Sequence, residues 1–246
     1  MNNPLDVLLD SGLAIVTLNR GDVGNPLNFE LLNSLKNELE ALSDNPDVRV
    51  ILLRSNSSRF CTGMDFVSLR EKPDDPDIFR NAIELYSSVL TILYAGSKPT
   101  ICVVNGEVKA GGVGIVCACD IVIASPAAEF CLSEVLFGLI PANVMPYLLG
   151  YRITPQKARY LILTSKTIHA ADAQAIGIVD ETAEERDLEK VLKGHVRRLL
   201  RSSPSALAEL KRFTDEVSGG KDETRALAVE KLMSLMQNDE VLAAID

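Results

Sequence analysis

The feature that most constrains the fold is the alternation of short apolar runs with helical periods over the first 180 residues. Apolar runs typical of buried strands occupy residues 48–55, 99–106 and 121–126. Between them, apolar residues recur every three or four positions over residues 28–46 and 74–97, as they do on one face of a helix. Strands and helices that alternate in this way predict βαβ crossovers and a largely parallel sheet.

A strand pair around the turn Asp10-Ser11-Gly12 and a helix over residues 155–165 complete the first part of the chain. After Asp180 the pattern changes, because three helical segments follow with no strand between them. We therefore predict an α/β core over residues 1–190 and a helical region over residues 191–246. The helical region cannot bury all its apolar faces alone, so it should pack on the core or on a neighbouring subunit.

Composition excludes several classes of partner. The net charge is −9 and there is no tryptophan, which argues against nucleic acid, because binding to phosphates needs clustered Lys and Arg. No apolar stretch reaches the roughly 20 residues that a membrane span needs. The first residues lack the basic region of a signal peptide, so we expect no secretion signal. The five cysteines fit no zinc or redox spacing, which predicts reduced thiols, no metal site and a cytoplasmic protein.

Glycines mark two junctions between a strand and a helix. The first is Cys61-Thr62-Gly63-Met64-Asp65, and the second is Ala110-Gly111-Gly112-Val113-Gly114. Glycine lets the chain turn with free N–H groups at a helix start. Two such groups aimed at one point would form an oxyanion hole for a thioester carbonyl that becomes an enolate. The alternative is that these glycines only allow close packing of helix on strand.

The chain resembles the crotonase (enoyl-CoA hydratase/isomerase) superfamily over about residues 5–215. Five motifs occur in that family's order and spacing: VTLNRGDVGNPLN, FCTGMDF, KPTICVVNGEVKAGGVGIVCACDIVIA, FCLSEVLFGLIP and TIHAADAQAIGIVDE. The resemblance implies an α/β fold of spiral ββα units whose helical C-terminal region forms trimers or hexamers. It also implies acyl thioester substrates on coenzyme A or on the phosphopantetheine of an acyl carrier protein, with no other cofactor. The family's oxyanion N–H groups fall on Met64 and Gly111.

The same resemblance leaves one catalytic carboxylate of a usual pair. Hydratases of fatty-acid metabolism place two glutamates around a water, and in register these fall on Gly114 and Glu134. A single base can still remove the α-proton beside a thioester, which makes Glu134 the main catalytic candidate. Its alternatives are a helix-cap role or a buried salt bridge. Asp65, beside Met64 at a helix start, is either a proton donor or a cap of exposed N–H groups.

Other residues are weaker candidates for binding substrate or partner. Thr62, Lys109 and Gly112 flank the two glycine junctions, and Lys109 either contacts a substrate carboxylate or points to solvent. An acidic carrier protein needs a basic docking patch, although the chain is acidic overall. The candidates for that patch are Lys98, Lys109, Arg152, Lys157 and Arg159.

One subgroup of the family is more similar than the rest. In the run GLIPANVMPYLLGYRITPQKARYLILTS, Pro141-Ala-Asn replaces a usual proline and glycine pair, as in the crotonase-like enzymes of polyketide β-branching cassettes. One such enzyme dehydrates a 3-hydroxy-3-methylglutaryl thioester on an acyl carrier protein to the 3-methylglutaconyl thioester. Its sister decarboxylates that product with a lysine, whose place Lys72 occupies, and a C-terminal histidine. Here the last histidine is His195, which favours dehydration.

Three other functions stay open from the sequence. The first is isomerisation or hydration of a small enoyl-CoA, which also needs an oxyanion hole and a glutamate. The second is the sister decarboxylation. The third, motivated by the glutamate missing at Gly114, is a non-catalytic scaffold that binds acyl thioesters.

Overall fold

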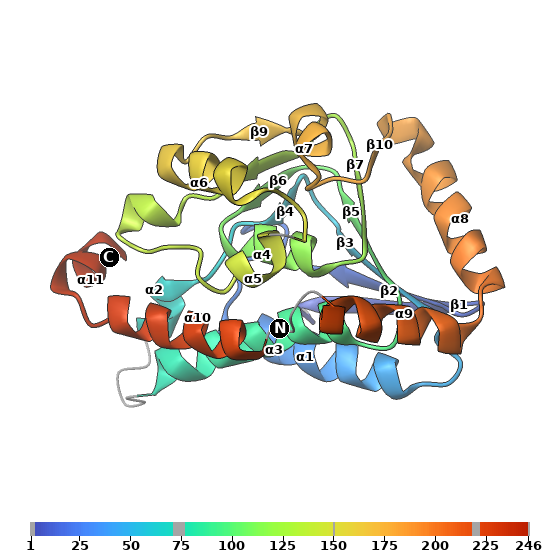
Figure 1. The fold of residues 1–246 in the computed structure, drawn as a ribbon, viewed down its shortest axis with the longest axis horizontal. Helices are drawn as coiled ribbons and strands as arrows, with labels where there is room; N and C mark the ends of the chain where they lie inside the picture. The colour runs from blue at the N-terminus through green and yellow to red at the C-terminus, as the bar shows by residue number, and fades with distance from the viewer. Residues whose placement is uncertain (1–2, 71–76, 150, 218–221, 246) are drawn as a thin grey trace.

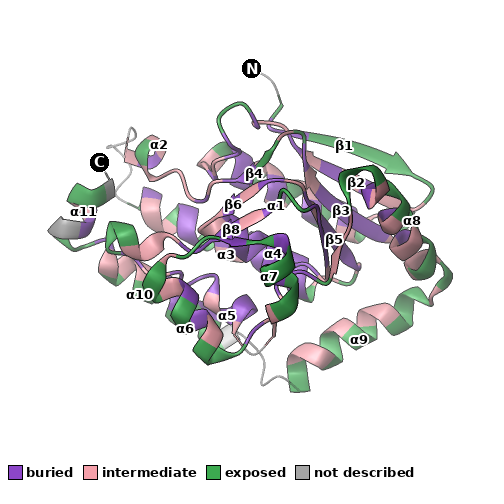
Figure 2. Ribbon diagram, turned by 90° about the horizontal axis from the view of Figure 1, so that it is seen from above, coloured by how far each residue is buried: buried purple, intermediate pink, exposed green. Residues whose placement is uncertain are grey.

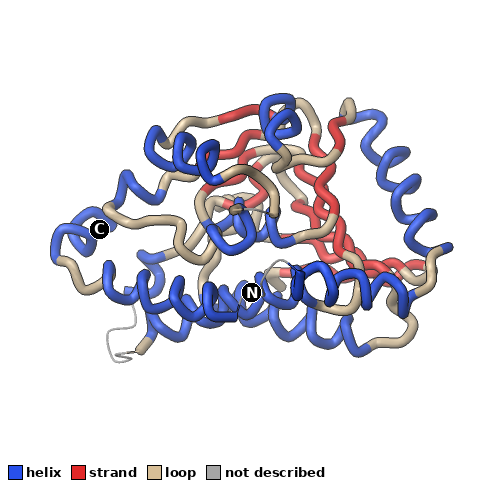
Figure 3. Tube along the Cα trace, viewed as in Figure 1, coloured by secondary structure: helices blue, strands red, loops and turns tan. Residues whose placement is uncertain are grey.

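The computed structural model describes residues 3–70, 77–149, 151–217 and 222–245, and Lys72 lies outside these ranges. Two sheets form the core (Figures 1 and 3). The larger has the order β1-β2-β3-β5-β7-β10, in which only the β1–β2 pair is antiparallel. The smaller has the order β4-β6-β8-β9, with β9 antiparallel to β8. The prediction of an α/β fold with a largely parallel sheet is therefore confirmed.

The strands are β1 (Leu5–Asp10), β2 (Leu13–Leu18), β3 (Val50–Ser55), β4 (Arg59–Cys61), β5 (Thr100–Val104), β6 (Glu107–Lys109), β7 (Ile121–Ala124), β8 (Glu129–Cys131), β9 (Ile168–His169) and β10 (Glu181–Thr182). The helices are α1 (Phe29–Asp44), α2 (Phe66–Arg70), α3 (Ile78–Ala95), α4 (Gly111–Ala118), α5 (Met145–Leu148), α6 (Pro155–Thr164), α7 (Ala170–Ile176), α8 (Glu185–Arg201), α9 (Pro204–Val217), α10 (Asp222–Leu235) and α11 (Asp239–Ile245), with a 3₁₀ turn at Glu134–Phe137.

Helices cover both faces of the large sheet, so its central strands are buried on both sides. In β3, Ile51 and Leu53 join the main core with α1 and α3. Val50 and Leu52 face the other way and pack with residues of α8. This two-sided burial explains why β3 reads as an unbroken apolar run rather than as an alternating one.

The apolar stripe of α1 shows why the chain forms a helix here. Leu31, Leu35, Leu39 and Leu42 are buried on one face of the helix. The helix begins at Asn28, whose side-chain oxygen accepts a hydrogen bond from the Leu31 N–H at 2.9 Å. It ends just before Pro46, as the sequence predicts.

The last strand, β10, ends at Thr182, and helices α8 to α11 form the rest of the described chain, so the boundary predicted at residue 190 falls inside α8. Helix α10 lies along α3 (Figure 1). Met236 and Val241, from the end of the chain, are buried against Leu139 of the core. This part of the helical region therefore packs on its own core.

Within the described ranges, no helix is both long and apolar enough to cross a membrane. The same residues contain no cluster of three or more His, Cys, Asp or Glu side chains arranged to hold a metal ion.

Candidate active site

Three neighbouring strands of the small sheet lead into the candidate site. β4, β6 and β8 are parallel to one another. β4 is followed by Thr62 to Asp65, β6 by Ala110 and Gly111, and β8 by Ser133 and Glu134. Because parallel strands end at the same edge of a sheet, three loops that are distant in sequence meet there.

The loops after β4 and β6 are in direct contact. Gly63 has a φ of 95°, which favours glycine, and a Cβ atom there would lie 2.9 Å from the Cβ of Ala110. The same atom would lie 3.3 Å from the amide nitrogen of Gly111. Ala110 itself has φ 46° and ψ −120°, a conformation that turns the chain sharply into α4.

Two main-chain N–H groups remain free at this contact. Among the described residues, the N–H groups of Met64 and Gly111 donate no hydrogen bond to any other group. Gly111 is the first residue of α4, where the first N–H groups lack a partner in the helix, and Met64 bridges to Leu27. Both residues line one cavity. The arrangement can bind an oxygen atom that gains negative charge.

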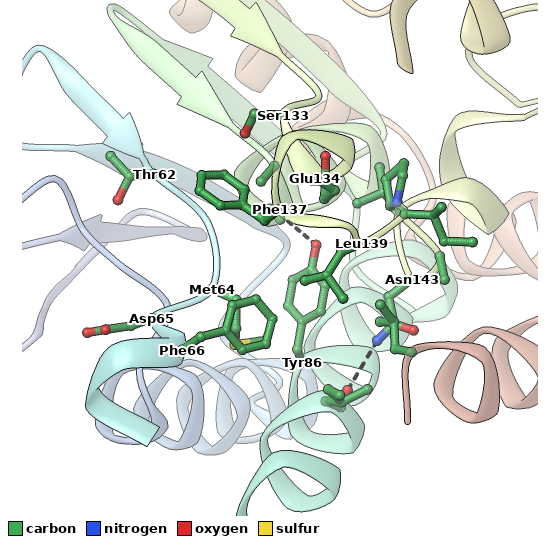
Figure 4. Close-up of a pocket in the computed structure, with 18 of the residues that line it drawn as sticks. Thr62, Met64, Asp65, Phe66, Tyr86, Ser133, Glu134, Phe137, Leu139 and Asn143 are labelled. Atoms are coloured by element: carbon green, nitrogen blue, oxygen red, sulfur yellow. Dashed lines mark hydrogen bonds between the residues drawn. The ribbon is translucent and has the colours of Figure 1, made fainter. Parts of the chain in front are cut away.

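The cavity has a volume of about 310 Å³ and is mostly apolar (Figure 4). Polar side chains in its wall are few. The residues that line it are Pro26, Thr62, Met64, Asp65, Phe66, Val67, Ile83, Tyr86, Ala110, Gly111, Ser133, Glu134, Phe137, Leu139, Ile140, Pro141, Ala142, Asn143, Val144 and Leu232. None of these described lining residues is Lys, Arg or His. Leu232 belongs to α10, so the C-terminal helices help to close the cavity.

Glu134 is the carboxylate of this cavity best suited to move a proton. It begins the 3₁₀ turn after β8, and its Oε2 atom is buried without a hydrogen-bond partner. Burial raises the pKa of Glu134 to about 7, and the hydrogen bond from its own backbone N–H only partly opposes this shift. A carboxyl with this pKa exchanges its proton readily near neutral pH. Glu134 forms no salt bridge among the described residues, so that alternative is not supported.

Asp65 lines the same cavity but behaves as a helix cap. Its Oδ1 atom accepts a hydrogen bond from the Ser68 N–H at 3.0 Å, and Figure 4 shows its carboxylate pointing away from Glu134 and Tyr86. The geometry therefore supports the capping role, and a catalytic role for Asp65 stays a prediction. Thr62, also in the wall, donates its hydroxyl to the Gly24 carbonyl oxygen at 3.2 Å.

The other two predicted substrate contacts lie outside the described lining. Lys109 forms an ion pair with Glu107 and is partly exposed to solvent. At Gly112, a Cβ atom would lie 2.6 Å from the Cys61 carbonyl oxygen, so this glycine is required for the contact of α4 with β4. Their assignment as substrate contacts stays a prediction that the geometry does not favour.

Three polar residues of the cavity wall, Tyr86, Ser133 and Asn143, were not predicted from the sequence as site residues. Tyr86, on α3, donates its hydroxyl to the Gly111 carbonyl oxygen at 2.6 Å. Asn143 donates its side-chain amide to the Ile83 carbonyl oxygen at 3.2 Å and is buried. Tyr86 belongs to the apolar stripe of α3, and no spacing in the sequence distinguishes it from its neighbours. Asn143 had a signal, because it lies in the run Pro141-Ala-Asn, where the resemblance to fatty-acid crotonases implies a glycine pair.

Comparisons with known proteins agree with this geometry. The family model described as Enoyl-CoA hydratase/isomerase matches residues 9–243. The bacillaene synthase dehydratase PksH of Bacillus subtilis (strain 168) is 32% identical over 225 residues, which cover 92% of this chain and 85% of that protein. The hydroxycinnamoyl-CoA hydratase-lyase of Pseudomonas fluorescens is 31% identical over 210 residues, which cover 83% of this chain and 75% of that protein.

Solved structures show the same relationship. The crystal structure of PksH from Bacillus subtilis superposes with a TM-score of 0.87 at 29% identity, covering 98% of this chain and 95% of that one. An enoyl-CoA hydratase from Mycobacterium avium superposes with a TM-score of 0.87 at 28% identity, covering 100% of this chain and 95% of that one. The chain belongs to the enoyl-CoA hydratase/isomerase (crotonase) family and is an enzyme of its lyase and hydratase class.

Proposed function

We propose that this enzyme dehydrates a 3-hydroxyacyl thioester, and that its substrate is 3-hydroxy-3-methylglutaryl-acyl carrier protein, which becomes 3-methylglutaconyl-acyl carrier protein. The observation that carries the proposal is the position of a single unpaired carboxylate, Glu134, in one cavity with two free N–H groups. Similarity to a polyketide dehydratase over 92% of the chain supports the choice of substrate.

The proposed reaction uses one base. The thioester carbonyl oxygen accepts hydrogen bonds from the N–H groups of Met64 and Gly111. Glu134 takes the proton from C2, and the electron pair moves into an enolate that the two N–H groups stabilise. The enolate then re-forms the carbonyl, the C3–O bond breaks, and the departing hydroxide takes the proton from Glu134 to leave as water. The products are the enoyl thioester and water, with Glu134 restored.

No further cofactor is needed for this chemistry, because the pantetheine arm of the carrier brings the acyl group into the cavity. The carrier is proposed to be an acyl carrier protein, with coenzyme A as the alternative. The structure corrects one residue of the docking patch predicted for that partner. Arg152 cannot contribute, because its side chain is only 5% exposed and is paired with Asp180.

A second candidate function follows from the charge of the cavity. The described lining contains no cation to pair with the distal carboxylate of a 3-hydroxy-3-methylglutaryl group. In the dehydratase, that carboxylate would have to reach the open end of the cavity, where solvent screens its charge. The acyl group of a small enoyl-CoA carries no charge, so it needs no such contact with solvent. This favours hydration or isomerisation of a small enoyl-CoA as the alternative.

Mass spectrometry of the acylated carrier protein separates these functions. Incubation with the enzyme should remove 18 Da if dehydration occurs, whereas a loss of 44 Da would indicate decarboxylation and overturn the proposal. Glu134→Gln should slow the reaction by at least about 10²-fold, the usual contribution of a general base. Glu129→Gln is a matched control, because Glu129 lies on β8 but faces His169 outside the cavity. Faster turnover of a small enoyl-CoA than of the carrier substrate would favour the alternative.

We also propose that the chain forms a homotrimer or a pair of trimers. Helix α9 contains no buried residue (Figure 2). Leu210, Phe213 and Val217 follow one face of it at helical spacing and are more than half exposed. Sedimentation of the wild type and of Phe213→Asp should show a trimer that the substitution weakens.

The five buried, unpaired cysteines support a reducing compartment, so we propose that the protein is cytoplasmic.

A further inference from the structure

The hydroxyl of Tyr86 lies beside Gly111 and Gly114, two of the three glycines of α4. It donates a hydrogen bond of 2.6 Å to the Gly111 carbonyl oxygen (Figure 4). A Cβ atom on Gly111 would lie 3.4 Å from this hydroxyl, and one on Gly114 would lie 2.1 Å from it. Tyr86 is 3% exposed and belongs to the wall of the active cavity.

The hydroxyl is a stable donor at any working pH. Burial raises the pKa of Tyr86 well above its usual value, and the nearby Cys61 and Glu134 side chains add to the shift when they are charged. The proton of the hydroxyl is therefore retained and shared with Gly111. A glycine at a helix start has more conformational freedom than any other residue, so a hydrogen bond to its carbonyl restricts the orientation of its peptide units.

The same hydroxyl occupies the space that a side chain at position 114 would need. A distance of 2.1 Å is far below any normal contact, so no residue larger than glycine fits at 114 while Tyr86 keeps its place. By the resemblance to the family, position 114 corresponds to the first glutamate of the two-glutamate hydratases. Tyr86 and Gly114 thus replace one carboxylate by one neutral hydroxyl that comes from a different helix.

We infer that Tyr86 is a positioning residue: its hydroxyl holds the Gly111 carbonyl, which restricts backbone rotation at this glycine and so keeps the Gly111 N–H, in the preceding peptide unit, facing the thioester oxygen. Its pairing with Gly114 keeps a second carboxylate out of the site. The inference rests on the proposed function in taking Gly111 as an oxyanion donor. It goes beyond it in naming the group that fixes this donor and that makes the site a one-base site.

Removal of the hydroxyl alone tests the positioning role. Tyr86→Phe should lower the rate of C2 proton exchange of butyryl-CoA in D₂O by about 10-fold, the effect of losing one hydrogen bond in the transition state. Its dissociation constant for butyryl-CoA should change less than 2-fold, because the cavity keeps its shape. The infrared C=O stretch of the bound thioester should shift toward its value in water. Tyr94→Phe is the control, since Tyr94 is buried on the same helix but lies outside the described lining.

The steric pairing has a test that needs no ligand. Gly114→Ala should lower the melting temperature strongly in the wild type and clearly less in the Tyr86→Phe background, because the clashing oxygen is then gone. Contacts of 3.1 Å with the Val144 Cγ2 atom and of 3.3 Å with the ring atom Cζ of residue 86 remain in both backgrounds and account for the residual cost. An equal loss in both backgrounds would show that the two positions do not compete for one space.

Failure of the proposed function and failure of the positioning role give different results. If the wild type does not exchange the C2 protons of butyryl-CoA at all, the enolate chemistry of the proposed function is wrong, and the positioning role falls with it. If the wild type exchanges them and Tyr86→Phe does so at the same rate, only the positioning role is overturned. Dehydration of the carrier substrate is not needed for either measurement.

Discussion

Gly63 and Gly111 lie so close that a side chain on Gly63 would stand 3.3 Å from the Gly111 amide nitrogen. They are 48 positions apart in sequence, and the parallel pairing of β4 with β6 brings them together. Since Met64 follows Gly63, this contact also fixes the distance between the two N–H groups assigned to the thioester oxygen.

Gly63→Ala is expected to damage catalysis more than folding. The new methyl group would press on Ala110 at 2.9 Å, in a backbone conformation with φ 95° that alanine rarely adopts. Displacing an oxyanion donor costs about 10²–10³-fold in kcat. The measurement is kcat on the proposed carrier substrate, with circular dichroism to verify the fold. A folded variant with wild-type kcat would contradict the role assigned to this junction.

The pH dependence of the rate should report Glu134. The carboxyl must be ionised to take the C2 proton, and its pKa is raised to about 7 by burial. The value of kcat/KM should therefore rise with pH through about 7 and level off above it, and Glu134→Gln should lose this dependence with the rate. A profile of the wild type that is flat from pH 5 to pH 9 would assign the proton transfer to another group.

The same pKa predicts how stability depends on pH. Between the usual pKa of 4.5 and the folded-state value of about 7, the folded protein holds a proton that the unfolded chain has released. Stability must then fall as pH rises through this window, by about 3 kcal/mol at most, and stay constant above it. Glu134→Gln removes this loss, so the variant should unfold at higher urea concentration than the wild type at pH 8 but not at pH 4.5. An equal difference at both pH values would contradict the assignment.

Substitution by alanine should change the stability of the fold in opposite directions at two glycines. Gly112→Ala places a methyl group 2.6 Å from a backbone oxygen of Cys61, which cannot move freely, and should destabilise the fold by roughly 1–3 kcal/mol or more. Gly194 lies inside α8 with nothing within 4 Å of its missing Cβ. Gly194→Ala should therefore stabilise the protein by about 0.5–1 kcal/mol, because alanine favours helices. Urea denaturation of both variants checks the pair.

The long elements of the fold could be predicted from the sequence because their burial is periodic. α1, α3 and the strands β3 and β5 match the predicted segments, and three of the four C-terminal helices were expected. The small sheet was not, since β4, β6 and β8 have three residues each and so short a run shows no periodicity. These strands form only because each one pairs with a neighbour from a distant part of the chain.

The candidate site, like the fold, has residues that could be predicted from the sequence and residues that could not. Of the residues predicted for the site, Met64, Gly111, Glu134, Asp65 and Thr62 all line the cavity. The glycine junctions indicated free N–H groups at two helix starts, and resemblance to the family then assigned the roles of Met64, Gly111 and Glu134. Tyr86 left none, because its role depends on a contact between α3 and α4 that no stretch of either helix encodes alone.

The small sheet has a consequence for how such an enzyme can change its chemistry. Its three parallel strands are spaced by main-chain hydrogen bonds, at roughly 4.8 Å from one strand to the next, so the separation of the loops they carry does not depend on which side chains those loops hold. The acid-base residue after β8 can therefore be exchanged or moved while the two N–H groups that follow β4 and β6 stay in place. Selection can therefore alter the proton transfers at this site without disturbing the N–H groups that bind the thioester oxygen.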